Sequence, residues 1–214
     1  MSDTHALLSD YDAEDIIEKD RRHVWHHLLQ HKIHEEQDPK IFVEGQGVRV
    51  TDIHGVEYLD ASSGGVWCVN VGYGRESMAK VIHDQLLKLP YYAGVAGTVP
   101  AAQFADKLTN LLPGLDRVFF ANSGSEANET AIKIAKSYHK RTGEAGRYRI
   151  IGRRGSYHGT LGQTMWMGQP SNDYGLTDFE PRYPGMLHAP HPNPYRCELG
   201  GTTPSECAVK CAEA

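Results

Sequence analysis

The sequence lacks a long apolar run, an excess of positive charge and a dense set of cysteines. No stretch approaches the roughly 20 consecutive apolar residues that a membrane-spanning helix needs. The 22 Lys and Arg residues face 27 Asp and Glu, so the net charge is −5 and no strong positive field exists to neutralise nucleic-acid phosphates. Seven acids among the first twenty residues argue against a signal or transit peptide. We therefore expect a soluble, cytoplasmic protein with neither nucleic acid nor a membrane as partner.

Cysteine is scarce and shows none of the common metal-ligand spacings. The four cysteines are Cys68, Cys197, Cys207 and Cys211. They include no Cys-x-x-Cys pair, and four in 214 residues do not suggest a disulfide framework. The twelve histidines also show no ligand grouping: His188 and His191 are close in sequence, but no carboxylate or third histidine accompanies them. We expect reduced thiols and no metal site.

What the chain does have is the composition of a globular protein. Hydrophobic residues make up 40% and charged residues 23%, and 214 residues suffice for one domain or one and a fraction. Ile17, Val24 and Leu28 recur at helical spacing and predict a helix from about Ala13 to His34. Three short extended segments follow, separated by glycine-containing turns, and predict a small antiparallel sheet over 41–43, 48–52 and 56–60.

Beyond residue 74, longer helices alternate with short apolar strands. The pattern predicts helices at 76–89, 101–112 and 126–142, and strands at 117–121 and 149–152. Strand, helix and strand in this order form a βαβ unit, which implies a parallel sheet covered by helices. The segment 168–201 is rich in Pro, Gly and Asn and predicts a long surface loop. The fold class is therefore predicted to be α/β.

The last predicted helix begins close to the end of the sequence. Thr203-Pro204-Ser205-Glu206 combines an N-cap residue, a proline in the first turn and a glutamate three residues after the cap. Only eight residues follow Glu206. One βαβ unit with a further helix beginning is an incomplete α/β domain, so we expect a truncated chain.

The segment Phe119–Asn128 carries the strongest local signal for ligand binding. A predicted strand leads through Ser123-Gly124-Ser125 into a helix N-terminus, where backbone N–H groups have no helical partner and the dipole is positive. A dianionic phosphate fits there, with Gly124 allowing close approach and Ser125 adding its hydroxyl. The alternative is a plain capping box of Ser123 and Glu126. Walker A, G-x-G-x-x-G and G-x-S-x-G motifs are absent from the sequence, which weakens nucleotide and hydrolase interpretations.

A second motif, Gly155–Gly159 (Gly-Ser-Tyr-His-Gly), follows the second predicted strand of the βαβ unit. Ligands bind at the carboxyl ends of parallel strands, so this loop and the Ser123–Ser125 turn should lie at the same edge of the sheet. Tyr157 could there stack on a flat ring; the alternative is that it covers the core with its hydroxyl hydrogen-bonded. A phosphate site beside an aromatic side chain predicts a planar phosphorylated cofactor.

A third candidate is Trp67, which lies in the glycine-rich segment 63–74. A tryptophan among small residues indicates a pocket wall, although ordinary core packing is equally open. The segment His23–His27, which includes Trp25, is ambiguous in the same way, because His26 and His27 also fit an exposed helix surface.

These segments together resemble a known enzyme family. Asn122–Asn128, Tyr157–Gly159, Leu59–Trp67 and Asn70–Gly74 are similar to the N-terminal half of a class III aminotransferase of the ω-amino acid:pyruvate type, and the resemblance runs from about Asp20 to the last residue. It implies the type I fold of pyridoxal-phosphate-dependent enzymes. Residues 1–69 would then belong to the small domain, and residues 70–214 would open the large, cofactor-binding domain.

The resemblance also implies roles for individual residues. The Ser123-Gly124-Ser125 turn would hold the cofactor phosphate, and Tyr157 would stack on the pyridine ring with His158 beside it. The substrate pocket would be walled by Trp67, Trp25 and Tyr91. Within the family, His23–Lys32 together with Ser63–Trp67 is most similar to members that use taurine.

The family uses a catalytic Lys, which forms a Schiff base with the cofactor, and an acid, which pairs with the pyridine nitrogen. Neither is found at a matching position in this chain. We therefore expect no catalytic residue here and no transamination by this chain alone. The complete homodimeric enzyme would move the amino group of taurine or a similar ω-amino acid to pyruvate, giving L-alanine and an aldehyde (sulfoacetaldehyde from taurine). The alternatives are a class III aminotransferase acting on β-alanine or other amines, an aminomutase, or a non-catalytic module that binds a phosphorylated ligand.

Overall fold

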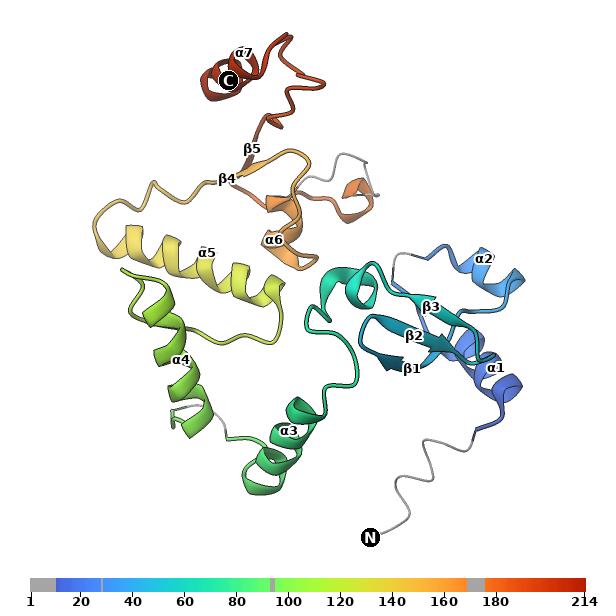
Figure 1. The fold of residues 1–214 in the computed structure, drawn as a ribbon. Helices are drawn as coiled ribbons and strands as arrows, with labels where there is room; N and C mark the ends of the chain where they lie inside the picture. Colours follow the sequence, from blue (N-terminus) through green and yellow to red (C-terminus); the bar gives the residue numbers. More distant parts are fainter. Residues whose placement is uncertain (1–10, 28, 93–94, 169–175) are drawn as a thin grey trace. The chain divides into compact units, whose positions relative to one another are not determined.

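The computed structural model of the chain describes residues 11–27, 29–92, 95–168 and 176–214 (Figure 1). The chain divides into two compact units, Met1–Gly97 and Thr98–Ala214. This division differs from the boundary expected at 69/70, because helix α3 (Glu76–Lys88) falls in the first unit. The expected small and large domains therefore remain a prediction about the complete fold. Within the described ranges, every helix is too short or too polar to cross a membrane.

Unit 1 begins with two short helices where the sequence predicted one. Helix α1 (Ala13–His23) starts at the N-cap Asp12, whose side chain accepts hydrogen bonds from the first turn. It ends at Val24, whose backbone is extended, and α2 (His31–Glu36) follows after a loop. Valine is β-branched and loses side-chain freedom in a helix, so the helical pattern is weak at this point. The prediction of a continuous helix to His34 is wrong; Leu28 lies outside the described residues.

The predicted antiparallel sheet is confirmed. Its strands pair in chain order and are β1 (Phe42–Gln46), β2 (Arg49–Asp52) and β3 (Glu57–Leu59). Asp52 shapes the turn between β2 and β3, because its Oδ1 accepts hydrogen bonds from the N–H groups of His54 (3.0 Å) and Val56 (2.9 Å). An irregular turn (Ser63–Trp67), in which Gly64 and Gly65 have positive φ, and then α3 follow the sheet.

Unit 2 is organised around the long helix α5 (Gly124–Arg141). The other elements are α4 (Val99–Leu111), β4 (Ile150–Arg153), α6 (Gly162–Met167), the 3-10 turn η3 (Leu176–Phe179), β5 (Met186–Ala189) and α7 (Pro204–Glu213). Helix α6 packs against α5, β4 and β5 (Figure 1). The buried side chains of Ile132, Trp166 and Met186 meet there and form the core of the unit. The four helices predicted beyond residue 74 are thus confirmed to within about two residues at their ends.

A parallel pair of strands is present, but it is not the predicted pair. Strand β4 lies beside β5, with Ile150 opposite Met186. Because β5 falls inside 168–201, the prediction of an unbroken loop is wrong; residues 169–175 of that segment lie outside the described ranges. The strand predicted at 117–121 is not formed, and Phe119 is 67% exposed. An extended segment becomes a strand only where a neighbour completes its hydrogen bonds, and no described strand pairs with this one.

Candidate functional site

The Ser123–Ser125 turn forms the N-terminus of α5. Ser123 is the N-cap, and its Oγ accepts a hydrogen bond from the N–H of Glu126 at 3.2 Å. The Glu126 carboxylate accepts the N–H of Asn122 at 2.8 Å. The capping interaction left open by the sequence is therefore formed. It leaves the N–H groups of Gly124 and Ser125 without a hydrogen bond among the described residues, so capping does not exclude an anion site.

Ser125 joins this turn to the loop that follows β4. Its Oγ accepts a hydrogen bond from the N–H of Thr160 at 3.2 Å. One turn further along α5, Nδ2 of Asn128 donates to the carbonyl oxygen of His158 at 2.8 Å. These contacts confirm that the two motifs lie side by side, but the expected common sheet edge is absent because residues 117–121 do not form a strand. Because the Ser125 oxygen accepts here, its own proton remains available for donation to another oxygen.

Two glycines permit this close approach. Gly159 has a φ of +139°, and a Cβ on it would lie 2.5 Å from Oγ of Ser125 and 2.7 Å from Oγ1 of Thr164. Gly168 follows α6, and a Cβ there would lie 2.8 Å from the carbonyl oxygen of Ser156. A side chain at either position would push the 155–160 loop away from its neighbours. The sequence indicated neither role, because no local pattern shows which atoms approach a glycine in the fold.

Glu129 fixes α5 against α6 beside the same loop. Its carboxylate accepts hydrogen bonds from the N–H of Thr164 (2.9 Å) and from Nε2 of Gln163 (3.0 Å). Nζ of Lys136 donates to Oε1 of Gln163 at 2.6 Å. Both Gln163 and Thr164 are buried, so these bonds replace solvation that the groups have lost. Sequence reasoning missed this support, because the partners of Glu129 lie 34 and 35 residues away.

Tyr157 and His158 lie on the loop that Ser125 holds. Tyr157 is 70% exposed, and its hydroxyl has no hydrogen bond among the described residues. Within this chain it therefore does not cover the core of unit 2. An exposed aromatic ring three residues from the Thr160–Ser125 bond can stack on a flat ligand. His158 is half-buried beside it.

The predicted substrate residues belong to unit 1. Trp67 ends the Ser63–Trp67 turn with a φ of +62° and is 77% exposed, so it does not pack in the core of unit 1 as this chain forms it. Asp60 organises that turn: its Oδ2 accepts hydrogen bonds from the N–H of Gly64 (2.6 Å) and from the hydroxyl of Tyr73 (2.7 Å). Trp25 and Tyr91 are also exposed. All three aromatic rings are accessible on the surface of unit 1, and their contact with a substrate stays a prediction.

The α5 turn has the donors that a phosphate needs. It offers two N–H groups that no described residue pairs with, the proton of the Ser125 hydroxyl and the positive end of an 18-residue helix. Each hydrogen bond to a charged oxygen contributes about 1.5–3 kcal/mol. The exposed ring of Tyr157 offers a surface for an aromatic group attached to that phosphate. The residues present therefore fit a flat, phosphorylated cofactor.

Known proteins share this sequence closely. The family model for class III aminotransferases matches residues 32–213. A hypotaurine/taurine–pyruvate aminotransferase from Paracoccus denitrificans is 48% identical over 189 residues, which cover 88% of this chain and 41% of that protein. A taurine–pyruvate aminotransferase from Rhodobacter capsulatus is 46% identical over 212 residues, which cover 98% of this chain and 45% of that protein.

Solved structures share the fold. An (S)-enantioselective ω-transaminase from Thermomicrobium roseum has a TM-score of 0.87 at 32% identity, over 95% of this chain and 45% of its own. An ω-transaminase from Pseudomonas jessenii, solved in complex with PMP, has a TM-score of 0.84 at 30% identity, over 92% of this chain and 44% of its own. The chain spans less than half the length of these relatives. It belongs to the class III aminotransferases, and it carries part of the type I fold of pyridoxal-phosphate-dependent enzymes.

Proposed function

We propose that the protein to which this chain belongs transfers the amino group of taurine or a similar ω-amino acid to pyruvate, with pyridoxal phosphate as cofactor. The products are L-alanine and an aldehyde, which is sulfoacetaldehyde when taurine is the donor. The identity to taurine–pyruvate aminotransferases supports the donor class. The observation that carries the proposal is the hydrogen bond between Ser125 and Thr160, which joins the phosphate-binding turn to the loop of Tyr157.

Pyridoxal phosphate, when bound, supplies an electron-withdrawing ring that stabilises negative charge at the carbon bearing the amino group. The residues of this chain hold and orient that ring. The N–H groups of Gly124 and Ser125 and the Ser125 hydroxyl bind the phosphate, with Ser123 capping the helix behind them. Tyr157 covers one face of the ring, and His158 lies beside it. Because one hydrogen bond joins the two loops, the phosphate and ring contacts keep a fixed spacing.

The aromatic side chains of unit 1 serve the donor rather than the cofactor in this proposal. Trp67, Trp25 and Tyr91 are exposed apolar rings that can exclude water from a small amine. We assign residues 1–69 to the small domain of the complete fold and residues 70–214 to its large domain. The Lys and the acid that complete the site are supplied from outside these 214 residues, and the complete protein acts as a homodimer in the cytoplasm.

A binding measurement on the chain tests the cofactor site. The probe is pyridoxamine phosphate, which carries no aldehyde and so cannot react with surface lysines, and binding is followed by isothermal titration calorimetry. Ser125→Ala should weaken binding about tenfold or more, since a charge-assisted hydrogen bond is lost. The control is Ser137→Ala, on the same helix and twelve residues away. Equal binding by the two variants would place the phosphate elsewhere.

A second variant separates a cofactor site from a simple phosphate site. Tyr157→Ala should weaken the binding of pyridoxamine phosphate several-fold, because the contact with the ring is removed. The affinity of the variant for inorganic phosphate, measured by competition with that probe, should be unchanged. If Tyr157→Ala binds the probe as the parent does, the chain recognises phosphate without the ring, which favours the non-catalytic module.

Turnover tests the donor and the missing Lys. The 214-residue chain should form no alanine from taurine and pyruvate, whereas the complete protein should do so with taurine giving the highest kcat/KM among taurine, β-alanine and putrescine. A higher value for β-alanine or putrescine assigns another donor within the family. Normal turnover by the 214-residue chain would overturn the placement of the Lys.

A further inference from the structure

The break between α1 and α2 brings together three side chains that a continuous helix would keep apart. Asp20 lies in the last turn of α1, His26 in the loop, and His34 on α2. In an unbroken helix Asp20 and His34 would be about 21 Å apart, because each residue adds about 1.5 Å. In the structure one ligand atom from each of the three lies within 4.8 Å of the other two. The sequence did not indicate this cluster, because its three residues come together only where the helix breaks.

The three side chains share one carboxylate oxygen. Nε2 of His26 lies 2.8 Å from Oδ1 of Asp20, and Nε2 of His34 lies 3.4 Å from the same atom. The His34 side chain is 3% exposed, and its Nε2 is buried without a hydrogen-bond partner among the residues that the structure describes. A buried ring nitrogen that makes no hydrogen bond costs about 1–3 kcal/mol. Two imidazole nitrogens therefore lie next to one carboxylate oxygen: Nε2 of His26 is hydrogen-bonded to it, and Nε2 of His34 is not.

A metal ion would satisfy all three groups at once. Two ligand atoms bound to one Zn²⁺ at about 2.0–2.1 Å in tetrahedral geometry are about 3.3 Å apart, close to the 3.4 Å between Asp20 and His34. The shorter Asp20–His26 contact is a hydrogen bond that opens by about half an ångström when the ion replaces the proton. Two imidazoles and one carboxylate form a ligand set that suits Zn²⁺ and neighbouring divalent transition metals, and they leave a fourth position for water.

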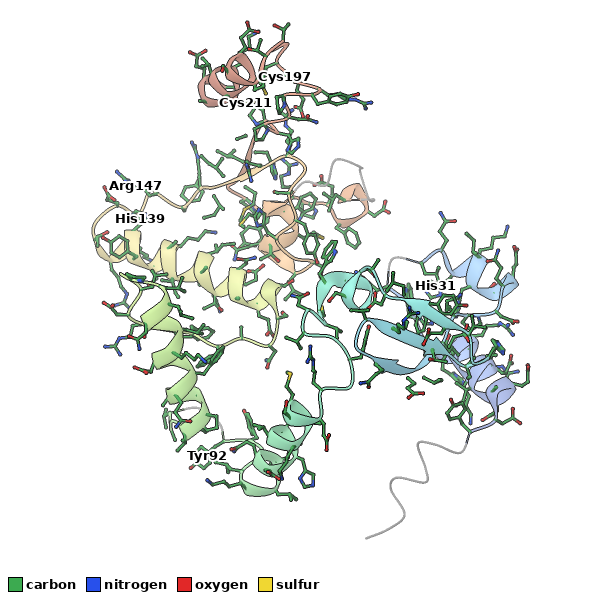
Figure 2. All side chains as sticks on the ribbon, in the orientation of Figure 1. His31, Tyr92, His139, Arg147, Cys197 and Cys211 are labelled. Carbon is green, nitrogen blue, oxygen red and sulfur yellow. The ribbon has the colours of Figure 1, made fainter. Side chains whose placement is uncertain are left out.

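The surroundings are packed rather than loose. The rings of His26 and His34 meet edge to face with centroids 4.6 Å apart. His31, labelled in Figure 2, lies on α2 with its ring 6.1 Å from that of His34 and 5.0 Å from that of Trp25. Such neighbours restrict the imidazoles to few rotamers, so little side-chain entropy would be lost on binding an ion.

We propose that Asp20, His26 and His34 form a binding site for a divalent transition-metal ion such as Zn²⁺. The ion would link α1 to α2 across the loop. The proposal is independent of the amino-transfer function, because none of the three residues belongs to the cofactor site. Its ligands come from a stretch of fifteen residues in unit 1, from Asp20 to His34.

The test uses the 214-residue chain purified without a polyhistidine tag and titrated with Co²⁺ and then Zn²⁺ near pH 7.5, where an ordinary histidine is neutral. Visible Co²⁺ bands report the nitrogen and oxygen ligands, and near-ultraviolet charge-transfer bands report any binding to cysteine. We expect one Co²⁺ per chain at this site and its displacement by Zn²⁺. The His26→Gln and Asp20→Asn variants should each weaken binding at least tenfold.

His27→Gln is the matched control, because His27 is an exposed neighbour outside the cluster and should leave the titration unchanged. His26→Gln is preferred to a change at buried His34, and circular dichroism of the metal-free variants shows that each is folded. Binding that is equally strong in His26→Gln and the parent overturns the proposal. So does the absence of a visible Co²⁺ band at about 100 µM metal in a folded parent chain.

Discussion

Two serine- and glycine-rich turns of the chain differ in whether their N–H groups are hydrogen-bonded to a carboxylate of the chain. In unit 1, the turn that leads to Trp67 closes on Asp60, whose carboxylate accepts hydrogen bonds from Ser62, Gly64 and Tyr73. In unit 2, the Glu126 carboxylate is directed at the N–H of Asn122. The remaining N–H groups of the Ser123–Ser125 turn thus have no anion from within the described part of the chain.

The difference lies in where the nearest carboxylate is, not in composition. The hydroxyl of Tyr73, followed by the N–H of Gly64, lowers the pKa of Asp60 to about 2, and the same contact raises the pKa of Tyr73. In the Asp60 turn, the donors are therefore paired with a carboxylate of the same chain. These hydrogen bonds hold the backbone of the turn that ends at Trp67. In the α5 turn, the N–H groups of Gly124 and Ser125 stay unpaired among the described residues. In both turns, backbone N–H groups can bind an anion. Where a carboxylate of the chain lies close enough, as Asp60 does, that carboxylate is the anion that they bind.

The largest effect should come from adding a side chain where the α5 turn meets its neighbour. Gly159→Ala adds a Cβ 2.5 Å from Oγ of Ser125 at a φ of +139°. Backbone strain and overpacking together should cost about 2–4 kcal/mol of unfolding free energy, measured in urea, and pyridoxamine phosphate binding should fall more than tenfold.

Gly143→Ala is the matched control for that variant. Gly143 also has a positive φ, +88°, but a Cβ there meets nothing within 4 Å. Strain alone should cost about 1–2 kcal/mol and leave binding unchanged. If the two variants lose the same stability and both keep binding, the contact between Ser125 and Gly159 does not shape the site.

Removing the internal anion tests the other turn. Asp60→Asn should lower the urea midpoint at pH 7, because the hydrogen bonds from Gly64 and Tyr73 lose their charged acceptor. The pKa of Asp60 falls from 3.8 to about 2 on folding. Its carboxylate therefore stabilises the folded chain above about pH 4, and this contribution disappears as the pH falls from about 4 towards 2.

The parent and Asp60→Asn should accordingly differ most above pH 4 and converge towards pH 2, measured as urea midpoints across that range. Asp106→Asn, an exposed acid on α4, serves as the control and should follow the parent. A pH-independent difference between parent and Asp60→Asn would show that the charge of Asp60 does not hold the turn.

A third turn extends the comparison to a thiol. The N–H of Gly201 lowers the pKa of Cys197, whereas hydrogen bonding to Cys197 and then burial raise the pKa of Cys207 to about 12. Cys197 and Cys211 both lie at the α7 end of unit 2 (Figure 2). Iodoacetamide at pH 8 should therefore alkylate Cys197 at least tenfold faster than Cys207, followed by mass spectrometry. Equal rates in the folded chain would contradict the assignment; equal rates are expected only after unfolding.

How much of this fold could be read from the sequence depended on the distance between partners. The antiparallel sheet and helices such as α5 rest on hydrogen bonds between near neighbours, and their patterns were sufficient. Strand β5 escaped prediction because its partner β4 begins 36 residues earlier and four residues carry no periodicity. The prediction of one continuous helix over α1 and α2 was wrong for a different reason, since the spacing of apolar residues does not show where a helix ends.

The candidate site divides in the same way. The serines of the α5 turn and the ring of Tyr157 were predicted from local motifs, and the contact between their loops is confirmed by Ser125 and Thr160. The supporting role of Gly159 and Glu129 depends on atoms more than thirty residues away. No pattern in a single sequence indicates which distant atoms those will be.

The smallest expected effect concerns the cap itself. Ser123→Ala removes the acceptor for the N–H of Glu126 and should cost about 1 kcal/mol, whereas Ser123→Gly should cost only a few tenths, because glycine is tolerated at an N-cap. Thr203→Ala at the equivalent cap of α7 should cost a similar amount. Urea unfolding and pyridoxamine phosphate binding are measured on all three. If Ser123 only caps the helix, Ser123→Gly binds as the parent does; if its hydroxyl also contacts the phosphate, Ser123→Gly keeps its stability but loses affinity. The result shows whether the phosphate is bound by Gly124 and Ser125 alone or by Ser123 as well.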